Sequence, residues 1–153
     1  MKGKAIAAQR APVRAPSVYT SLTAKDVMQR PVLAATPQAA LRDVAIQLVA
    51  NEISGMPVAA PDGRVVGVVT ESDIVRTLVE GKRLENLTAT DVMTGPPVAV
   101  DINTPIEEVM KKLEDYRIVR VPVTDGEVLV GVISRRDIIK AVLEPEFMAF
   151  GEL

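Results

Sequence analysis

The sequence predicts a mixed α/β (α+β) protein in which one β-α-β-β-α unit occurs twice. Two observations predict this class. The chain repeats itself with an offset of 65 residues, as Asp26 and Asp91 show, and in each copy helical periodicity of the apolar residues alternates with strand-like runs. Of the 153 residues, 48% are hydrophobic and only 3% aromatic, so we expect a core of aliphatic side chains.

The repeat is visible in short motifs that keep their register. Pro31 matches Pro96, and Asp73 matches Asp137. The tripeptide at 26–28 recurs at 91–93. Met-Pro-Val at 56–58 aligns with Val-Pro-Val at 121–123, and, after a one-residue gap near Gly63, the tripeptide at 66–68 recurs at 130–132. Two valine-rich stretches would not keep a proline, a glycine and an aspartate in step by chance, so we treat the repeat as real.

Each copy is expected to begin with a short extended segment, after Pro31 in the first copy and after Pro97 in the second, and then to form a helix. Thr104 and Pro105 suit the cap and first turn of the second helix. Both helices show an i, i+3, i+4, i+7 apolar stripe, made by Leu41, Val44, Ala45 and Leu48 in copy one and by Ile106, Val109, Met110 and Leu113 in copy two.

A β-hairpin and a last helix complete each copy. Asp62-Gly63 and Asp125-Gly126 are typical hairpin turns between β-rich runs. The spacing predicts strands at 56–60 and 65–69, then at 121–124 and 128–133, with final helices over about 72–79 and 136–143.

These elements divide the chain into a basic N-terminal tail (1–20), repeat one (21–80), a linker (81–89), repeat two (90–144) and a C-terminal tail (145–153). The N-terminal tail holds Lys2, Lys4, Arg10 and Arg14 and no acid. We expect it to be flexible and without a fold of its own. It is either a solvated tail or an arm for an anionic partner, and nucleic acid binding is expected only through it.

Composition excludes most catalytic chemistry. The chain has no Cys and no His, which removes disulfides, thiol nucleophiles, Ser-His-Asp triads and imidazole metal sites. Composition leaves carboxylate, hydroxyl, Lys, Arg and all-oxygen metal chemistry open. We expect no enzyme and no metal site. No apolar run approaches the roughly 18 residues of a membrane span, and residues 5–8 are too short for a signal-peptide core. We expect a cytoplasmic protein without membrane association.

The most informative motif joins the second hairpin strand to the last helix. It reads Gly67-Val-Val-Thr70-Glu-Ser-Asp73 in copy one and Gly131-Val-Ile-Ser134-Arg-Arg-Asp137 in copy two. A hydroxyl residue followed three positions later by an acid is a helix capping box. The same residues suit a nucleoside phosphate: helix amides attract phosphate, a carboxylate matches vicinal ribose hydroxyls, and the glycine permits close approach of a ligand.

On these motifs the chain resembles a tandem pair of CBS domains (cystathionine-β-synthase-type repeats), a regulatory module that senses adenine nucleotides. The resemblance covers about residues 22–143. It implies that the repeats pack sheet against sheet about a pseudo-two-fold axis and leave two clefts between them. In each cleft the aspartate would hold the ribose and aliphatic side chains would sandwich the adenine.

The resemblance also implies which residues form each cleft. One cleft would combine Val132, Ser134 and Asp137 with Met28, Leu33, Ile53 and Ser54. The other would combine Val68, Thr70 and Asp73 with Met93, Val98, Ile118 and Val119. Arg120 occupies a position where the family often places a basic residue on phosphates, whereas copy one has Gly55 there. With Arg135 and Arg136 nearby, the Asp137 cleft is expected to prefer the more highly charged phosphate.

The helices predict self-association. Ile46, Val49 and Ala50 form a second apolar stripe on the first helix, and the last helices also have more than one apolar face. The family commonly dimerises through these helices, so we expect a homodimer; deeper burial within one subunit is the alternative. The expected ligand is AMP, ADP or ATP, or else S-adenosylmethionine or an NAD-type molecule, with no required cofactor. An unidentified regulated protein would act in trans. The alternative function is a dimeric scaffold that binds no ligand.

Overall fold

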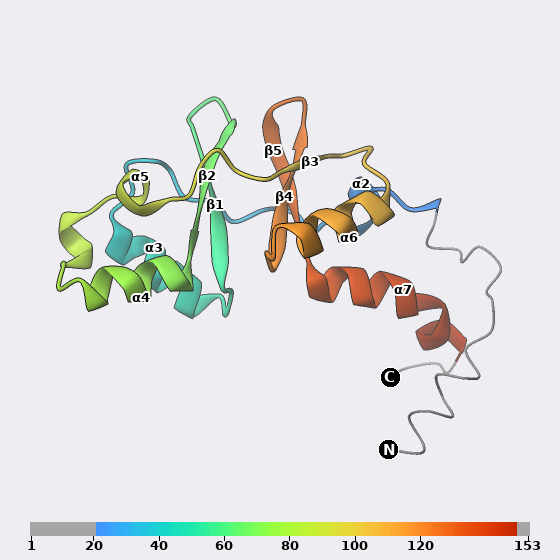
Figure 1. The fold of residues 1–153 in the computed structure, drawn as a ribbon. Helices are drawn as coiled ribbons and strands as arrows, with labels where there is room; N and C mark the ends of the chain where they lie inside the picture. Colours follow the sequence, from blue (N-terminus) through green and yellow to red (C-terminus); the bar gives the residue numbers. More distant parts are fainter. Residues whose placement is uncertain (1–20, 150–153) are drawn as a thin grey trace, which may run out of the picture.

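The computed structural model describes the backbone of residues 21–149 and the side chains of residues 21–144. Two small sheets lie at the centre, and helices cover their outer sides (Figure 1). The predicted α+β class is therefore confirmed. The expected N-terminal tail and residues 150–153 lie outside the described residues.

The first sheet is the hairpin of β1 (Gly55–Ala59) and β2 (Val65–Thr70), which pair antiparallel. Helices α3 (Leu41–Ala50) and α4 (Glu71–Val79) pack beside it. Gly63 in the turn has φ +90°, which a glycine adopts without strain. The extended segment expected after Pro31 makes only an isolated parallel bridge, between Ala35 and Val58, so the first predicted strand is reduced to one pair.

The second sheet has three strands. β3 (Val100–Asp101) runs parallel to β4 (Arg120–Asp125), which pairs antiparallel with β5 (Val128–Ser134). Helix α6 (Ile106–Asp115) has Pro105 as its N-cap, so Thr104 is not the cap that the sequence suggested. The Thr104 hydroxyl instead accepts a hydrogen bond from the Asp101 amide at 3.0 Å. Helix α7 (Arg135–Ala149) continues beyond the predicted end at 143.

The first helix of each repeat packs in the core of the other repeat. Helix α2 (Ala24–Val27) of repeat one packs in the core of repeat two, where Ala24 N–H donates to Thr104 O at 2.8 Å. Helix α5 (Ala89–Val92) packs in the core of repeat one, where Ala89 N–H donates to Ala39 O at 2.9 Å. The exchange ties the two repeats together by backbone hydrogen bonds.

The segment expected to link the repeats is itself packed. It contains the 3₁₀ turn η2 (Leu84–Asn86), and Leu84 and Leu87 pack against the first core. Leu87 O accepts from the Leu41 amide at the start of α3, at 2.8 Å. Residues 84–92 are thus part of the first structural unit and not a free connection.

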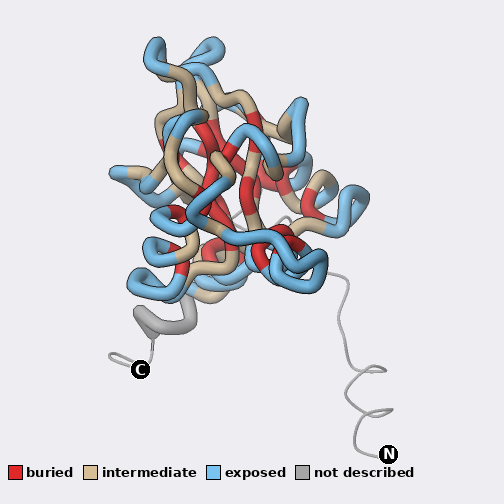
Figure 2. The backbone as a smooth tube through the Cα atoms, turned by 90° about the vertical axis from the view of Figure 1, so that its left-hand side faces the viewer, coloured by how far each residue is buried: buried red, intermediate tan, exposed pale blue. Residues whose placement is uncertain are grey.

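Two separate aliphatic cores result, as the composition predicted, and buried residues concentrate between the helices and the sheets (Figure 2). The buried members of the first core are Ala35, Leu41, Val44, Leu48, Met56, Val58, Val69, Ile74 and Ala89. Those of the second are Ala24, Val100, Ile106, Val109, Leu113, Val121, Val123, Ile133 and Ile138. The two hairpins also meet at their turns, where Leu129 N–H donates to Gly63 O at 2.9 Å.

The second apolar faces predicted on the helices are exposed. On α3, Val49 is 79% exposed, and on α4 the exposed fractions of Val75 and Val79 are 58% and 81%. The rest of the described chain therefore does not bury these side chains, which argues against deeper burial within one subunit.

Candidate functional site

Two cavities lie where the repeats meet. The smaller, which we name the Thr70 cavity, has a volume of about 430 Å³. The larger, the Ser134 cavity, has a volume of about 1080 Å³. Small-molecule sites occupy about 300–1,000 Å³. Both cavities are therefore large enough for a ligand of nucleotide size.

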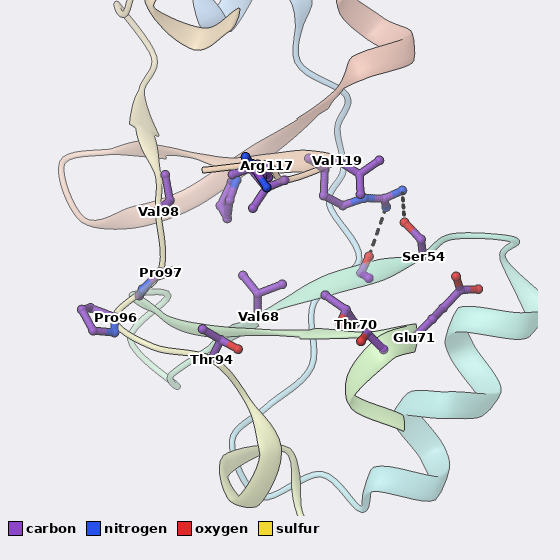
Figure 3. A pocket seen from close by; sticks show the side chains of 15 residues that line it. Ser54, Val68, Thr70, Glu71, Thr94, Pro96, Pro97, Val98, Arg117 and Val119 are labelled. Atoms are coloured by element: carbon purple, nitrogen blue, oxygen red, sulfur yellow. Dashed lines mark hydrogen bonds between the residues drawn. The ribbon is translucent and has the colours of Figure 1, made fainter. Parts of the chain in front are cut away.

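Both repeats contribute to each cavity. The Thr70 cavity is lined by Ser54, Gly55, Val68, Thr70, Glu71, Ser72, Thr94, Pro96, Pro97, Val98, Arg117, Ile118, Val119, Arg120 and Pro122. The Ser134 cavity is lined by Gln29, Glu52, Ile53, Val119, Arg120, Val132, Ser134, Arg135, Arg136, Asp137, Ile139, Lys140 and Leu143. In Figure 3, Val68 and Thr70 on β2 face Arg117 and Val119 from repeat two across the Thr70 cavity.

The structure brings most of the predicted residues together. Of those expected in one cleft, Val68, Thr70, Val98, Ile118 and Val119 line the Thr70 cavity. Arg120, expected on phosphates, lines both cavities. Of those expected in the other, Ile53, Val132, Ser134 and Asp137 line the Ser134 cavity. Ser54 lines the Thr70 cavity and not the one for which it was predicted. Met28, Leu33, Asp73 and Met93 line neither cavity.

The two methionines lie outside the cavities because they cover the strand glycines. A Cβ atom at Gly131 would come within 2.5 Å of Met28 Sδ, and one at Gly67 within 2.6 Å of Met93 Sδ. The sequence suggested that these glycines admit a ligand. The structure corrects this interpretation, since the space beside each glycine is filled by a methionine from the exchanged segment.

Each aspartate of the motif forms the helix capping box. Thr70 N–H donates to Asp73 Oδ2 at 2.8 Å, and Ser134 N–H donates to Asp137 Oδ2 at 2.8 Å. The capping interpretation is thus realised in both copies, and one carboxylate oxygen of each aspartate is committed to it. A role in ligand binding is left to the second oxygen, Oδ1.

The Oδ1 atoms of the two aspartates have different partners. Asp137 Oδ1 accepts from Gln29 Nε2 at 2.6 Å, across the boundary between the repeats. Asp73 is only 3% exposed, and its Oδ1 lies 3.2 Å from Arg76 of its own helix. Asp137 therefore presents its acceptor toward a cavity, whereas Asp73 directs its acceptor along α4.

The first-turn amides of α4 and α7 are partly occupied. Glu71 N–H donates to Ser54 O at 2.9 Å, and Arg135 N–H donates to Val119 O at 3.0 Å. The amides of Asp73 and Asp137 donate to the capping hydroxyls. Fewer helix amides are thus free to donate hydrogen bonds to a phosphate than the sequence suggested. Binding of a phosphate would depend more on cationic side chains.

Cations surround the Ser134 cavity. Its lining contains Arg120, Arg135, Arg136 and Lys140, against the acids Glu52 and Asp137. The lining of the Thr70 cavity contains Arg117 and Arg120 against Glu71. The Ser134 cavity therefore carries the greater excess of positive charge, which favours anionic ligands.

Arg120 belongs to both linings. Its Nη1 donates to Gly55 O at 3.1 Å and its Nη2 donates to Ser54 Oγ at 3.3 Å (dashed lines in Figure 3). Burial lowers the pKa of its guanidinium, while the carboxylates of Asp137 and Glu71 act in the opposite direction. An arginine remains protonated in such surroundings, so Arg120 is a partly buried cation between the two cavities.

Sequence reasoning missed five polar lining residues outside the capping motifs: Gln29, Glu52, Thr94, Arg117 and Lys140. The repeat could have identified two of them. Glu52 and Arg117 directly precede the matched Ile53 and Ile118, and both adopt a left-handed φ of 53°. In this conformation the chain turns from the end of α3 or α6 toward the cavity.

No group of three or more His, Cys, Asp or Glu residues that could hold a metal occurs within residues 21–144. None of the helices in the described part combines the length and hydropathy that a membrane crossing requires.

The sequence matches the CBS domain family over residues 24–80 and 89–144, and the chain therefore belongs to that family. Hypoxic response protein 1 of Mycobacterium tuberculosis is 29% identical over 129 residues, which cover 84% of this chain and 90% of that protein. L-aspartate semialdehyde sulfurtransferase of Methanocaldococcus jannaschii is 26% identical over 132 residues, which cover 86% of this chain. The match covers only 24% of the sulfurtransferase.

Solved structures show the same fold. The CBS domain protein PAE2072 from Pyrobaculum aerophilum, complexed with AMP, superposes with a TM-score of 0.70 at 28% identity and covers 76% of this chain and 89% of that one. A CBS domain pair in complex with 5′-methylthioadenosine and S-adenosyl-L-methionine gives a TM-score of 0.70 at 27% identity and covers 77% and 93%. Hypoxic response protein 1, solved with two coordinated zinc ions, gives 0.72 at 28% identity, covering 77% and 97%.

Proposed function

We propose that this chain is a non-catalytic regulatory module that binds adenosine-type ligands in the Thr70 and Ser134 cavities and signals their presence to a partner protein. The observation that carries the proposal is the pair of cavities between the repeats, each of which ends at a hydroxyl-capped helix and contains Arg120. Complexes of related CBS pairs with AMP, with 5′-methylthioadenosine and with S-adenosyl-L-methionine support this ligand class.

The side chains suit the parts of such a ligand. Val132 and Ile53 offer an apolar lining for the adenine, and Asp137 Oδ1 offers an acceptor for ribose hydroxyls once Gln29 moves aside. Arg120, Arg135, Arg136 and Lys140 offer charge to phosphates. Because this cavity has the larger cationic excess, we propose that it prefers ATP or ADP, and that the Thr70 cavity takes a less charged ligand.

The test is thermal stability of the full chain with AMP, ADP, ATP, S-adenosylmethionine and NADH. A ligand at 100 times its Kd adds about 2.7 kcal/mol per site, or roughly 5–11 °C in Tm for a chain of this size. We expect Asp137→Asn to reduce the shift, because the asparagine oxygen keeps the cap while its NH₂ group replaces the outward acceptor.

The matched control is Asp91→Asn. Asp91 Oδ2 accepts from the Thr88 amide at 2.8 Å in a capping box of the same kind on α5, and the residue lines neither cavity. This variant should keep the full ligand shift. Equal loss in both variants would assign the aspartates to helix capping alone. No shift with any ligand at millimolar concentration would favour the alternative function, a dimeric scaffold.

The exposed apolar faces favour self-association as part of this function. The exposed large hydrophobic side chains on the helices are Ile46 and Val49 on α3, Val75, Leu78 and Val79 on α4, and Ile139 on α7. Exposed apolar side chains that gather on one surface mark protein interaction sites. We propose that these helices pair two copies of the chain, so that a ligand-dependent shift between repeats changes the shape of the dimer.

A further inference from the structure

Arg120 is the charged side chain that the linings of the two cavities share. It is the first residue of β4, and its repeat counterpart is Gly55, the first residue of β1. The guanidinium of Arg120 reaches the carbonyl of that counterpart at 3.1 Å. The side chain therefore ends close to the place where the two repeats face each other, which explains why this cation lines both cavities.

The present partners of the guanidinium are weak competitors for it. They are a carbonyl and a hydroxyl, both uncharged, and Nε is buried without any hydrogen-bond partner. A guanidinium has five N–H donors, and a bond to an anion is roughly twice as strong as a bond to a neutral acceptor. A phosphate that enters either cavity can therefore draw the guanidinium away from Gly55 O and Ser54 Oγ.

One acid from each side faces the same cation. Glu71 belongs to the Thr70 cavity and Asp137 to the Ser134 cavity, and the charges of both act on Arg120. The cation is thus poised between two negative sites, and neither holds it in an ion pair among the described residues. A dianionic phosphate in one cavity would therefore attract the guanidinium to that cavity.

We propose that Arg120 is a single anion-binding group shared by the two cavities, so that a phosphate-bearing ligand in one cavity weakens the binding of a phosphate-bearing ligand in the other. This inference rests on the proposed function. The phosphate that binds first draws the Arg120 guanidinium to its own cavity. A phosphate that then enters the other cavity finds no guanidinium there and is repelled by the negative charge of the first. Adenosine has no phosphate to attract Arg120, so its binding in one cavity should not affect the other.

The test compares AMP with adenosine by calorimetric titration of the full chain. Val68→Trp fills the Thr70 cavity and Val132→Trp fills the Ser134 cavity, so each variant reports the affinity of one cavity alone. The wild-type two-site isotherm then gives the coupling between them. We expect the second AMP to bind about tenfold more weakly than its cavity does alone, within the usual range of coupling, and adenosine to show less than about twofold coupling.

Arginine variants locate the coupling. Arg120→Gln, built in the wild-type chain and in both tryptophan backgrounds, should lower AMP affinity in each cavity and reduce the coupling below about twofold. The matched controls are Arg117→Gln, in the Thr70 cavity only, and Arg135→Gln, in the Ser134 cavity only. Each control should weaken AMP binding in its own cavity and leave the coupling unchanged.

Several results would overturn the inference. These are uncoupled AMP sites in the wild-type chain, coupling of equal size with adenosine, coupling that survives Arg120→Gln, and AMP binding by only one of the cavities. The first two need only the wild-type chain and the cavity-filled variants, so they decide the question even if Arg120→Gln does not fold. If neither adenosine nor AMP binds any form, the proposed function itself fails, which is a different outcome from binding without coupling.

Discussion

Replacing Gly131 with alanine tests the packing of Met28 against the second sheet. The new Cβ would lie 2.5 Å from Met28 Sδ and 2.9 Å from its Cγ. Non-bonded heavy atoms prefer about 3.5–4.0 Å, so the methionine must move by about 1 Å. Overpacking of this kind costs about 1–3 kcal/mol. We expect Gly131→Ala to lower the free energy of unfolding by this amount, measured by urea denaturation.

A double-mutant cycle with Met28→Ala separates this clash from other effects of the alanine. Once the long side chain is gone, only the Cβ of residue 28 lies close to the new methyl group, at 3.0 Å, so Gly131→Ala should cost much less than in the wild-type chain. The same cycle applies to Gly67 and Met93, where the added Cβ would lie 2.6 Å from Sδ. A cost of Gly131→Ala that is equal in both backgrounds would refute the assignment of the glycine to methionine packing.

Three further predictions concern the site, the surface and pH. Gln29→Thr removes the competitor at Asp137 Oδ1 and should tighten AMP binding in the Val68→Trp background about 2–10-fold, the worth of one hydrogen bond; weaker binding by calorimetry would mean that Gln29 holds the ligand. Val79→Glu on α4 should convert the proposed dimer to a monomer, measured by light scattering, with an unchanged circular dichroism spectrum. The control Val128→Glu, on the exposed hairpin, should leave the dimer intact. An unchanged mass for Val79→Glu would exclude this face of α4 from the dimer interface. Hydrogen bonds from the amide and hydroxyl of Thr23 lower the pKa of Asp26, the amide being the larger cause, so NMR titration of Thr23→Ala should find that pKa still below its usual value; a return to the usual value would assign the effect to the hydroxyl. Because the folded-state pKa is the lower one, the small stabilisation by this exposed carboxylate is present above the unfolded value near 4 and is lost as the pH falls through the folded value.

Local patterns made the hairpins and long helices predictable. The turn glycines Gly63 and Gly126 have the positive φ that an Asp-Gly turn requires, and the apolar stripe of α6 is buried at Ile106, Val109 and Leu113. The exchange of α2 and α5 between the repeats could not be predicted in this way. Each is a single turn of four residues, and no periodicity in so short a segment says which core it enters.

The candidate site was predictable where it depends on residue type and unpredictable where it depends on side-chain direction. Ser134 and Asp137 are identified by the repeated motif and Arg120 by the family resemblance, and all three line a cavity. Asp73 has the same motif and the same cap, yet its Oδ1 pairs with Arg76 of its own helix and the residue does not line the Thr70 cavity. The position of Arg120 between the two cavities depends on the distance between the two sheets. That distance cannot be predicted from the sequence of either repeat.

The central claim is that adenosine-type ligands bind between the repeats. An amide NMR titration of the full chain with AMP tests it most directly, because each residue reports its own surroundings. We predict the largest shifts at Val68 and Thr70 on β2 and at Val132 and Ser134 on β5. Shifts confined to the exposed faces of α3 and α4, or no shifts at millimolar AMP, would contradict it.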